Sequence, residues 1–179
     1  MQINRHIFLT GFMGSGKTQL GKKLASLLDA AFIDLDLMIS QEEKRTVPEI
    51  FKQDGEEEFR RLERVYLERI IAGQKISVIA LGGGTVCFNN NLALVKEAGL
   101  LVYIELNAAA LFDRLKNSTE RRPLLSGLSG QDLLQKIETL LQERKKFYEQ
   151  AHVTVKGVNL TAQALYTHIL EPGKTHSSD

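Results

Sequence analysis

Short apolar runs alternate with segments of helical periodicity along most of the chain, and this alternation restricts the fold more than any other feature. The runs with strand character cover residues 6–10, 31–35, 76–81, 100–106 and 152–155. Helical spacing of apolar residues starts near residue 17 and returns over residues 47–54, 56–72, 92–98, 109–116, 132–148 and 161–170. Strands that alternate with helices predict βαβ units, and therefore a mostly parallel sheet with helices on both faces. We expect one α/β domain over residues 1–170, followed by a flexible polar tail over residues 171–179.

Size and charge restrict what the protein can bind. The chain has 179 residues, of which 43% are hydrophobic and 25% charged, and this suits one globular domain. Its formal net charge is +1, so no overall field draws it to nucleic acid or to a membrane surface. No apolar stretch is long enough to span a bilayer. Because Cys87 is the single cysteine, no intramolecular disulfide can form, and a reducing, cytoplasmic location is expected.

A glycine-rich segment follows the first predicted strand and has the spacing of a phosphate-binding loop. Residues 11–18 read GFMGSGKT and match GxxxxGK[ST] in full, between a strand and a helix. Glycines let the backbone N–H groups converge on phosphate oxygens, and the following helix adds partial positive charge at its N-terminus. Lys17 would reach the β- and γ-phosphates, and the Thr18 hydroxyl would bind Mg²⁺. A glycine-rich turn that only caps a helix fits a complete match in this position less well. The residues expected to contact the nucleotide here are Gly14, Ser15, Gly16, Lys17, Thr18 and Gln19.

Two acidic residues stand at the end of the second predicted strand. Asp34 and Asp36 are two positions apart, so on a strand their side chains would lie on one face, beside the phosphate loop. Asp34 could then hold Mg²⁺ through a water molecule, and Asp36 could accept a hydrogen bond from an acceptor hydroxyl. The alternative is that both are exposed, or that they cap a helix beginning near Leu37. Their position beside a complete phosphate loop favours the functional interpretation.

Three arginines and a glycine run are further candidates. Arg60 borders the apolar face of a helix, where an arginine either extends to solvent or forms a wall of an anion pocket, and helix geometry leaves both open. The run Gly82–Gly84 exceeds what a tight turn needs, which favours close backbone approach to a ligand. Arg122 lies in a long polar loop with the character of a lid, although a solvated basic loop is the simpler alternative. Arg144 is near the C-terminal end of a helix, where a cation usually complements the helix dipole.

Taken together, these motifs resemble the shikimate kinase family, which has the nucleoside-monophosphate-kinase-like P-loop fold. The resemblance extends from about residue 7 to residue 148. Besides the phosphate loop it includes, in order, Asp34-Leu35-Asp36, Ile50-Phe51, Asp54-Gly55-Glu56, Phe59 to Glu63, Gly82 to Gly84, Arg122 to Leu125, and Arg144 with Tyr148. The stretch from Phe51 to Glu63, together with the glycine triplet, is the most specific part. The resemblance implies a single-domain P-loop kinase with a five-stranded parallel sheet in the order 2-3-1-4-5, flanked by helices, and a lid loop.

The resemblance also implies an activity, the direct in-line transfer of the γ-phosphoryl group of Mg²⁺-bound ATP to shikimate by a monomer. Lys17, Asp36 and Arg122 would be catalytic, and Arg122 would also contact the nucleotide. Thr18 and Asp34 would bind the metal. Shikimate would contact Asp36, Arg60, Gly82, Gly83, Gly84, Arg144, Phe51 and Phe59, with the two arginines at its carboxylate and the two phenylalanines under its ring. No arginine follows residue 155, so the adenine contact stays unassigned.

Two alternatives stay open from the sequence. Another small-molecule kinase of the same fold, such as a gluconate or nucleoside monophosphate kinase, would lack the combination of the glycine triplet with the Phe59-Arg60-Arg61 segment. A non-catalytic nucleotide-binding module would keep the phosphate loop, but it has no need for Asp36, Arg60 and Arg144 together.

Overall fold

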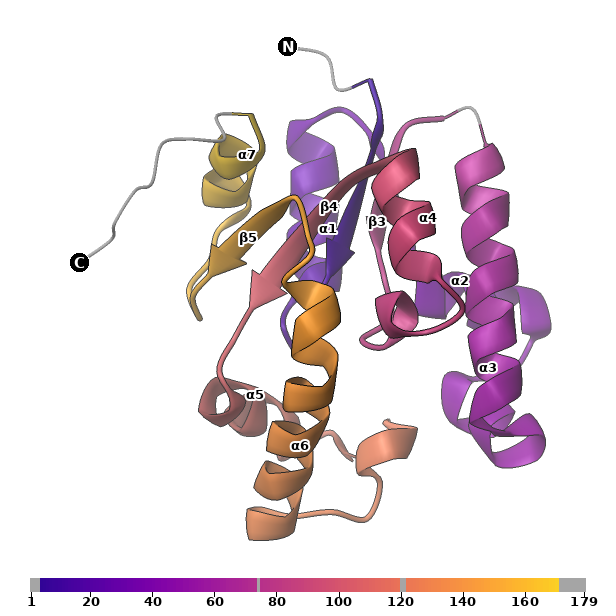
Figure 1. Ribbon diagram of the computed structural model, residues 1–179, viewed down its shortest axis with the longest axis vertical. Helices are drawn as coiled ribbons and strands as arrows, with labels where there is room; N and C mark the ends of the chain where they lie inside the picture. The colour runs from indigo at the N-terminus through magenta and orange to yellow at the C-terminus, as the bar shows by residue number, and fades with distance from the viewer. Residues whose placement is uncertain (1–3, 74, 120–121, 171–179) are drawn as a thin grey trace.

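A computed structural model describes residues 4–73, 75–119 and 122–170 of the protein (Figure 1). Five parallel strands form one sheet in the order β2-β3-β1-β4-β5, as expected. The strands are β1 (His6–Thr10), β2 (Ala31–Asp34), β3 (Ser77–Ala80), β4 (Gly99–Glu105) and β5 (Val153–Lys156). The proposed polar tail, residues 171–179, lies outside the described residues.

Seven α-helices and two short 3-10 helices connect these strands within the described part of the chain. The α-helices are α1 (Lys17–Leu27), α2 (Leu35–Glu43), α3 (Val47–Ala72), α4 (Asn91–Ala98), α5 (Ala108–Leu115), α6 (Gly130–Tyr148) and α7 (Ala162–Leu170). The 3-10 helices are η1 (Thr85–Cys87) and η3 (Pro123–Leu125). None of the described helices is both long and apolar enough to cross a membrane.

The alternation of side chains on the central strand divides the apolar core between the two faces of the sheet. Ile7 and Leu9 of β1 pack with residues of α1 and α7, whereas Phe8 between them packs with residues of α2, α3 and α4. A third apolar cluster joins α5, η3 and α6 beyond the carboxyl ends of the strands, where Figure 1 shows these elements below the sheet. Ligands of open parallel sheets bind at the carboxyl ends of the strands. We therefore expect a site at this edge, between the sheet and the third cluster.

The segment after β2 departs from the predicted pattern. The strand stops at Asp34, and α2 begins at Leu35, so the expectation that Asp34 and Asp36 share one strand is wrong. Asp34 is the N-cap of α2, because its Oδ1 accepts a hydrogen bond from the Leu37 backbone N–H at 3.2 Å. Asp36 is therefore in the first turn of a helix that starts at the carboxyl end of the sheet.

The two helices predicted on either side of Gly55 form a single kinked element, α3. Its first turn is fixed by a capping box in which Thr46 and Glu49 satisfy each other's backbone N–H groups. Gly55 then leaves helical geometry with φ 84° and ψ 175°, a conformation that strongly favours glycine. The kink redirects the second half of α3, which carries Phe59, Arg60 and Glu63.

Candidate active site

The phosphate loop curls between β1 and α1 in a conformation that its glycines make possible. Gly11 has φ 139°, and a side chain there would place a Cβ only 2.5 Å from the Ile104 carbonyl oxygen. Gly16 is the N-cap of α1 with φ 99° and offers no side-chain cap. The first-turn N–H groups of α1 are therefore directed to the loop without a side-chain acceptor, which suits an anion at this helix terminus.

Lys17 is buried at the start of α1, with 8% of its surface exposed. Its Nζ donates hydrogen bonds to the carbonyl oxygens of Gly11, at 2.8 Å, and Phe12, at 3.0 Å. Burial lowers the pKa of the ammonium group to about 8, against the opposing effect of the nearby Asp36 carboxylate. The charged end of Lys17 is thus held inside the loop that it is expected to serve.

Asp34 joins two elements through its two carboxylate oxygens. Oδ1 caps α2, and Oδ2 accepts a hydrogen bond of 2.6 Å from the Thr18 hydroxyl. The capping alternative considered for this residue is therefore correct. Capping does not exclude metal binding by Asp34, because the same carboxylate is hydrogen-bonded to Thr18, the other residue expected to bind the metal.

Asp36 is a partly buried residue, and one of its carboxylate oxygens, Oδ1, is shielded from solvent. Its Oδ1 makes no hydrogen bond with any of the described residues. Burial raises the pKa of Asp36 to about 7, and the neighbouring carboxylates of Glu63 and Asp34 add to this, against Lys17 and Arg60. A carboxylate with a shielded oxygen, a free lone pair and a pKa near neutrality can accept a proton from a bound group.

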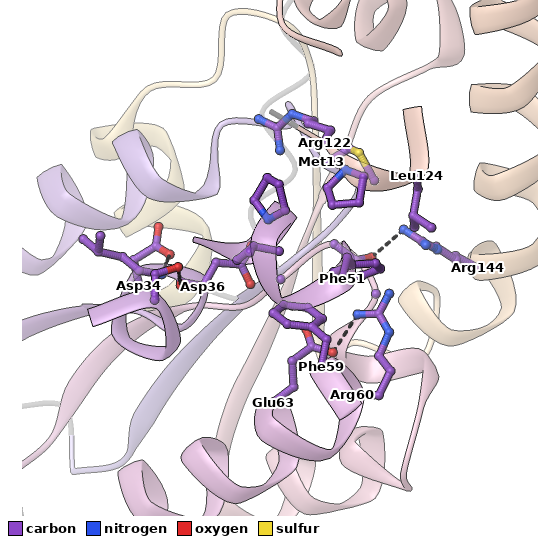
Figure 2. A pocket seen from close by; sticks show the side chains of 18 residues that line it. Met13, Asp34, Asp36, Phe51, Phe59, Arg60, Glu63, Arg122, Leu124 and Arg144 are labelled. Carbon is purple, nitrogen blue, oxygen red and sulfur yellow. Dashed lines mark hydrogen bonds and ion pairs between the residues drawn. The ribbon is translucent and has the colours of Figure 1, made fainter. Parts of the chain in front are cut away.

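Two cavities meet at this carboxylate. The larger, of about 600 Å³, extends from Asp36 to Arg60 and Arg144, and Figure 2 shows these side chains converging on it. The smaller, of about 530 Å³, extends along the phosphate loop, and Gly14, Gly16, Lys17, Thr18 and Gln19 line it. The residues that line both cavities are Met13, Asp34, Asp36, Gly83 and Arg122. A group bound in one cavity is thereby adjacent to a group bound in the other.

Arg60 lies on the wall of the larger cavity, although only 6% of its surface is exposed. Glu56 accepts hydrogen bonds from Nε and Nη2 at 3.1 and 2.7 Å. The fully buried Glu63 accepts one from Nη1 at 2.6 Å, which Figure 2 shows. These bonds use three of the five N–H donors of the guanidinium. The sequence left two interpretations open, and the structure places Arg60 buried at a cavity wall and not extended to solvent.

Arg144 approaches the same cavity from α6. It is 5% exposed, and its Nη1 donates to the Gly83 carbonyl oxygen at 3.3 Å (Figure 2). The buried Tyr148 hydroxyl donates to the same carbonyl, and the Phe12 ring lies 5.6 Å from the Arg144 Cζ. Arg144 is therefore not simply a surface cation that complements the end of its helix.

The glycine triplet is close-packed by the protein's own groups. A Cβ on Gly82 would lie 2.6 Å from Glu63 Oε1 and 2.7 Å from Asp36 Oδ1. One on Gly83 would lie 2.9 Å from the Met13 backbone nitrogen, and one on Gly84 would lie 2.8 Å from Arg60 Nη2. The groups that approach the triplet closely are thus side chains and backbone of the protein itself. The absence of side chains at the three glycines lets these groups lie next to one another.

Phe51 and Phe59 form an aromatic wall of the larger cavity, with ring centroids 4.9 Å apart.

Arg122 lines both cavities from the segment before η3, and its buried Nε has no partner among the described residues. Burial lowers the pKa of Arg122, and Asp36 opposes this effect. Residues 120 and 121 of the expected lid loop lie outside the described part of the chain.

Comparison with known proteins identifies the family of this chain. The family model described as shikimate kinase matches residues 13–172. The chain belongs to the shikimate kinase family. It is 40% identical over 149 residues to the shikimate kinase of Azobacteroides pseudotrichonymphae, covering 83% of this chain and 88% of that protein.

Solved structures of the family agree with the fold. A shikimate kinase from Acinetobacter baumannii, solved in complex with shikimate, superposes with a TM-score of 0.86 at 33% identity, covering 96% of this chain and 93% of that one. The enzyme from Bacteroides thetaiotaomicron gives a TM-score of 0.85 at 36% identity, covering 93% and 98%. The protein therefore catalyses the ATP-dependent phosphorylation of shikimate, and the alternatives of a different acceptor or a non-catalytic module fall away.

Sequence reasoning missed two residues that line this site. Glu63 is a fully buried acid that pairs with Arg60, and its spacing of three residues on one helix was an available signal. Arg114 of α5 lines the smaller cavity and donates to the carbonyl oxygens of Gly14, Ser15 and Val158. Nothing local in the sequence distinguishes Arg114 from other basic residues near helix ends, because its partners come from two distant loops.

Proposed function

We propose that the larger cavity binds shikimate and the smaller cavity binds the phosphates of ATP, with phosphoryl transfer at the boundary that Asp36 and Arg122 form. The observation that carries this assignment is the set of five residues that line both cavities. An acceptor hydroxyl beside Asp36 would face the γ-phosphoryl group across this boundary. Direct transfer needs only this juxtaposition, and most of the catalysis then comes from positioning and charge.

The polarity of the larger cavity suits a hydroxylated ring with one carboxylate. We assign the carboxylate of shikimate to Arg60 and Arg144, whose guanidinium groups are almost fully buried and reach the cavity from α3 and α6. Phe51 and Phe59 would contact the ring, and the backbone of the glycine triplet would lie beside the carboxylate. A buried arginine strengthens a charge-assisted hydrogen bond to a carboxylate, because water competes less for both groups.

The proposed chemistry is a single displacement. Asp36 accepts the proton of the acceptor hydroxyl, whose oxygen forms a bond to the γ-phosphorus as the bond from that phosphorus to the β,γ-bridging oxygen breaks. ADP leaves with the electron pair of that bond. Lys17 and Arg122 neutralise charge on the transferring group. Arg122 Nε is a buried donor without a partner among the described residues, and this supports a phosphate contact.

Thr18 and Asp34 would hold Mg²⁺ beside the phosphates. Their side-chain oxygens are 2.6 Å apart and line the smaller cavity, and they are the hard oxygen ligands that Mg²⁺ prefers. No group of three or more His, Cys, Asp or Glu side chains in the described residues could hold a metal ion. This agrees with an ion that takes its other ligands from phosphates and water. When bound, the ion would offset negative charge on the β- and γ-phosphates.

We assign the nucleoside half of ATP to the end of the smaller cavity that Arg114 and Leu115 line. Arg114 bridges the phosphate loop and the loop after β5, so its guanidinium is fixed at that end. We further propose that the protein acts as a cytoplasmic monomer.

The test is ADP release with Mg²⁺ and ATP, with shikimate, gluconate and a nucleoside monophosphate panel as acceptors. Asp36→Asn should lower kcat by about 10²- to 10⁴-fold, the usual contribution of a positioned base. Arg60→Ala should raise the shikimate KM by about 10- to 150-fold, which corresponds to the loss of a charged hydrogen bond. Arg61→Ala is the matched control, because Arg61 is exposed and its ion-pair partner in the described part of the chain is Glu58, outside both cavities. An unchanged shikimate KM in Arg60→Ala would remove the carboxylate assignment.

A further inference from the structure

A third aromatic ring covers Arg60 from outside the cavity. The centroid of the Phe88 ring lies 4.5 Å from the Arg60 Cζ, nearer than those of Phe59, at 5.5 Å, and Phe51, at 6.0 Å. Phe51 and Phe59 line the substrate cavity, whereas Phe88 does not. The Phe88 side chain is 38% exposed, so burial in the core is not its main contribution. A cation this close to an aromatic ring is attracted to the ring electrons.

Phe88 belongs to a segment that contacts Arg60 in several ways. We call residues 84–91 the clasp. Gly84 packs against the guanidinium, and the Asn89 side-chain amide donates to the Arg60 carbonyl oxygen at 2.9 Å. The Thr85 hydroxyl donates to Glu63 Oε1 at 2.5 Å, while Glu63 Oε2 accepts from Arg60. The clasp therefore contacts the Arg60 side chain, the Arg60 backbone and Glu63, the ion-pair partner of Arg60.

The clasp is held in one conformation by a buried hydrogen bond between two of its own residues, and it is tied to α3 by further polar contacts. The Asn91 side-chain amide donates to the Thr85 carbonyl oxygen at 2.9 Å, and both residues are fully buried. Arg64 donates to the Asn89 carbonyl oxygen at 3.1 Å, which ties the clasp back to α3. Buried hydrogen-bonded networks of this kind give a segment one well-defined position. The ring of Phe88 is therefore presented to Arg60 from a rigid support.

We propose that Phe88 is a positioning residue for the acceptor carboxylate, because its ring fixes the orientation of the Arg60 guanidinium while Thr85 fixes Glu63. The inference rests on the proposed role of Arg60 in substrate binding and adds a determinant of substrate affinity outside the cavity. Among the residues that the structure describes, protein partners occupy three of the five Arg60 N–H donors and leave two for a ligand. Their direction depends on the plane of the guanidinium, which the Phe88 ring supports.

The experiment compares Phe88 variants by steady-state kinetics with shikimate, ATP and Mg²⁺. Phe88→Ala should raise the shikimate KM about three- to thirtyfold, the range expected for loss of a cation–π contact with a largely desolvated arginine. The ATP KM and kcat should change less than twofold. Phe88→Tyr should keep the wild-type KM, and Phe88→Leu, which restores bulk without ring electrons, should resemble Phe88→Ala. Val65→Ala is the matched control, because Val65 is another exposed apolar residue, at 44%, and lies outside both cavities.

A second comparison isolates the carboxylate. Phe88→Ala should weaken binding of shikimate much more than competitive binding of its uncharged methyl ester, because the ring acts through the charge of Arg60. Thr85→Val should raise the shikimate KM in the same selective way, and Thr85→Ser, which keeps the hydroxyl, should restore it. Equal losses for the acid and the ester would overturn the inference, and so would wild-type kinetics in Phe88→Leu.

Arg60→Ala separates failure of the inference from failure of the proposed function. If Arg60→Ala raises the shikimate KM and Phe88→Ala leaves it unchanged, Arg60 binds the carboxylate but Phe88 does not position it. If Arg60→Ala leaves the shikimate KM unchanged, the assignment of the carboxylate to Arg60 is itself wrong, and the role of Phe88 fails with it.

Discussion

Gly84 offers the cleanest way to displace Arg60 without removing it. The backbone of Gly84 has φ −112° and ψ −8°, which alanine adopts without strain. A Cβ there would lie 2.8 Å from Arg60 Nη2 and 3.0 Å from both Cζ and Nη1. These atoms form the end of a flexible side chain, so the guanidinium would move by several tenths of an ångström while the backbone stays in place. Gly84→Ala is therefore expected to change the substrate site more than the fold.

The size of the effect follows from the bonds that Arg60 makes. A hydrogen bond to a charged group contributes about 1.5–3 kcal/mol, and we expect misalignment to remove about half of this from the bond to the substrate carboxylate. The shikimate KM should then rise about four- to tenfold. The free energy of unfolding should fall by no more than about 1–2 kcal/mol, because weaker pairing with Glu63 is partly offset by the lower entropy of an unfolded chain with alanine in place of glycine.

A double-variant cycle tests this account. Kinetics with shikimate and ATP, and urea unfolding, are measured for Gly84→Ala, Arg60→Ala and the double variant. Gly84→Ala should have little further effect on the shikimate KM once Arg60 is absent, because the two substitutions act on one interaction. Gly73→Ala is the matched control, since Gly73 also has an ordinary φ, −70°, and lies at the far end of α3. An equal rise in KM in both backgrounds would refute the reasoning.

Three further outcomes are expected. The acid limb of kcat/KM for shikimate should lie near pH 7, because burial and Glu63 raise the pKa of Asp36 to about 7 and only the carboxylate can accept a proton; a limb below pH 5 would contradict this. His6 Nδ1 accepts the Ser77 backbone N–H at 3.3 Å, and burial lowers the pKa of His6, so its stabilising contact is complete above pH 6.5 and is lost as the pH falls below that value. In urea unfolding, the difference in unfolding free energy between wild type and His6→Gln should therefore become smaller from pH 7.5 to pH 5.5. Asp36 changes stability in the opposite direction over this range, but it is present in both proteins and cancels in the difference. A difference that stays constant with pH would rule this out. Chelation by EDTA should abolish turnover, and Asp34→Asn should raise the Mg²⁺ concentration for half-maximal rate several-fold, whereas full activity in EDTA would refute the metal assignment.

The order of elements was predictable from local patterns, but the junction after β2 was not. Ile33, Leu35 and Leu37 alternate with Asp34 and Asp36, and this period of two is typical of a strand. In the structure Leu35 is fully buried and Leu37 is 53% exposed, which is helical behaviour. The sheet ends at Asp34 opposite Ala80, where the aspartate cap starts α2. A capping aspartate inside an alternating pattern fits either a continued strand or the start of a helix. The end of strand pairing with β3 selects the helix.

The part of the candidate site that lies in one continuous segment could be predicted from the sequence. The part that depends on packing between distant segments could not. The phosphate loop is one continuous segment, so its spacing contains most of the information. The position of Arg60 depends on Gly84 and Phe88, and that of Arg144 depends on Phe12 and Gly83, all distant in sequence. Helix periodicity cannot tell a buried arginine from a surface one when these partners come from other elements. A role for both residues is therefore predicted by the family resemblance alone, and not by their spacing.

The glycine triplet explains how the two adjacent cavities keep a fixed separation. Gly83 packs directly on the backbone nitrogen of Met13 in the phosphate loop, and its carbonyl oxygen accepts hydrogen bonds from Arg144 and Tyr148 on the acceptor side. Gly84 packs on Arg60 at the other wall of the same cavity. The separation of the phosphate loop from the points where the two guanidinium groups meet the triplet is thus set by the backbone, which varies less than side-chain rotamers do. In-line transfer requires reacting atoms to be aligned within a fraction of an ångström, and rigid backbone spacing meets that requirement before either substrate binds.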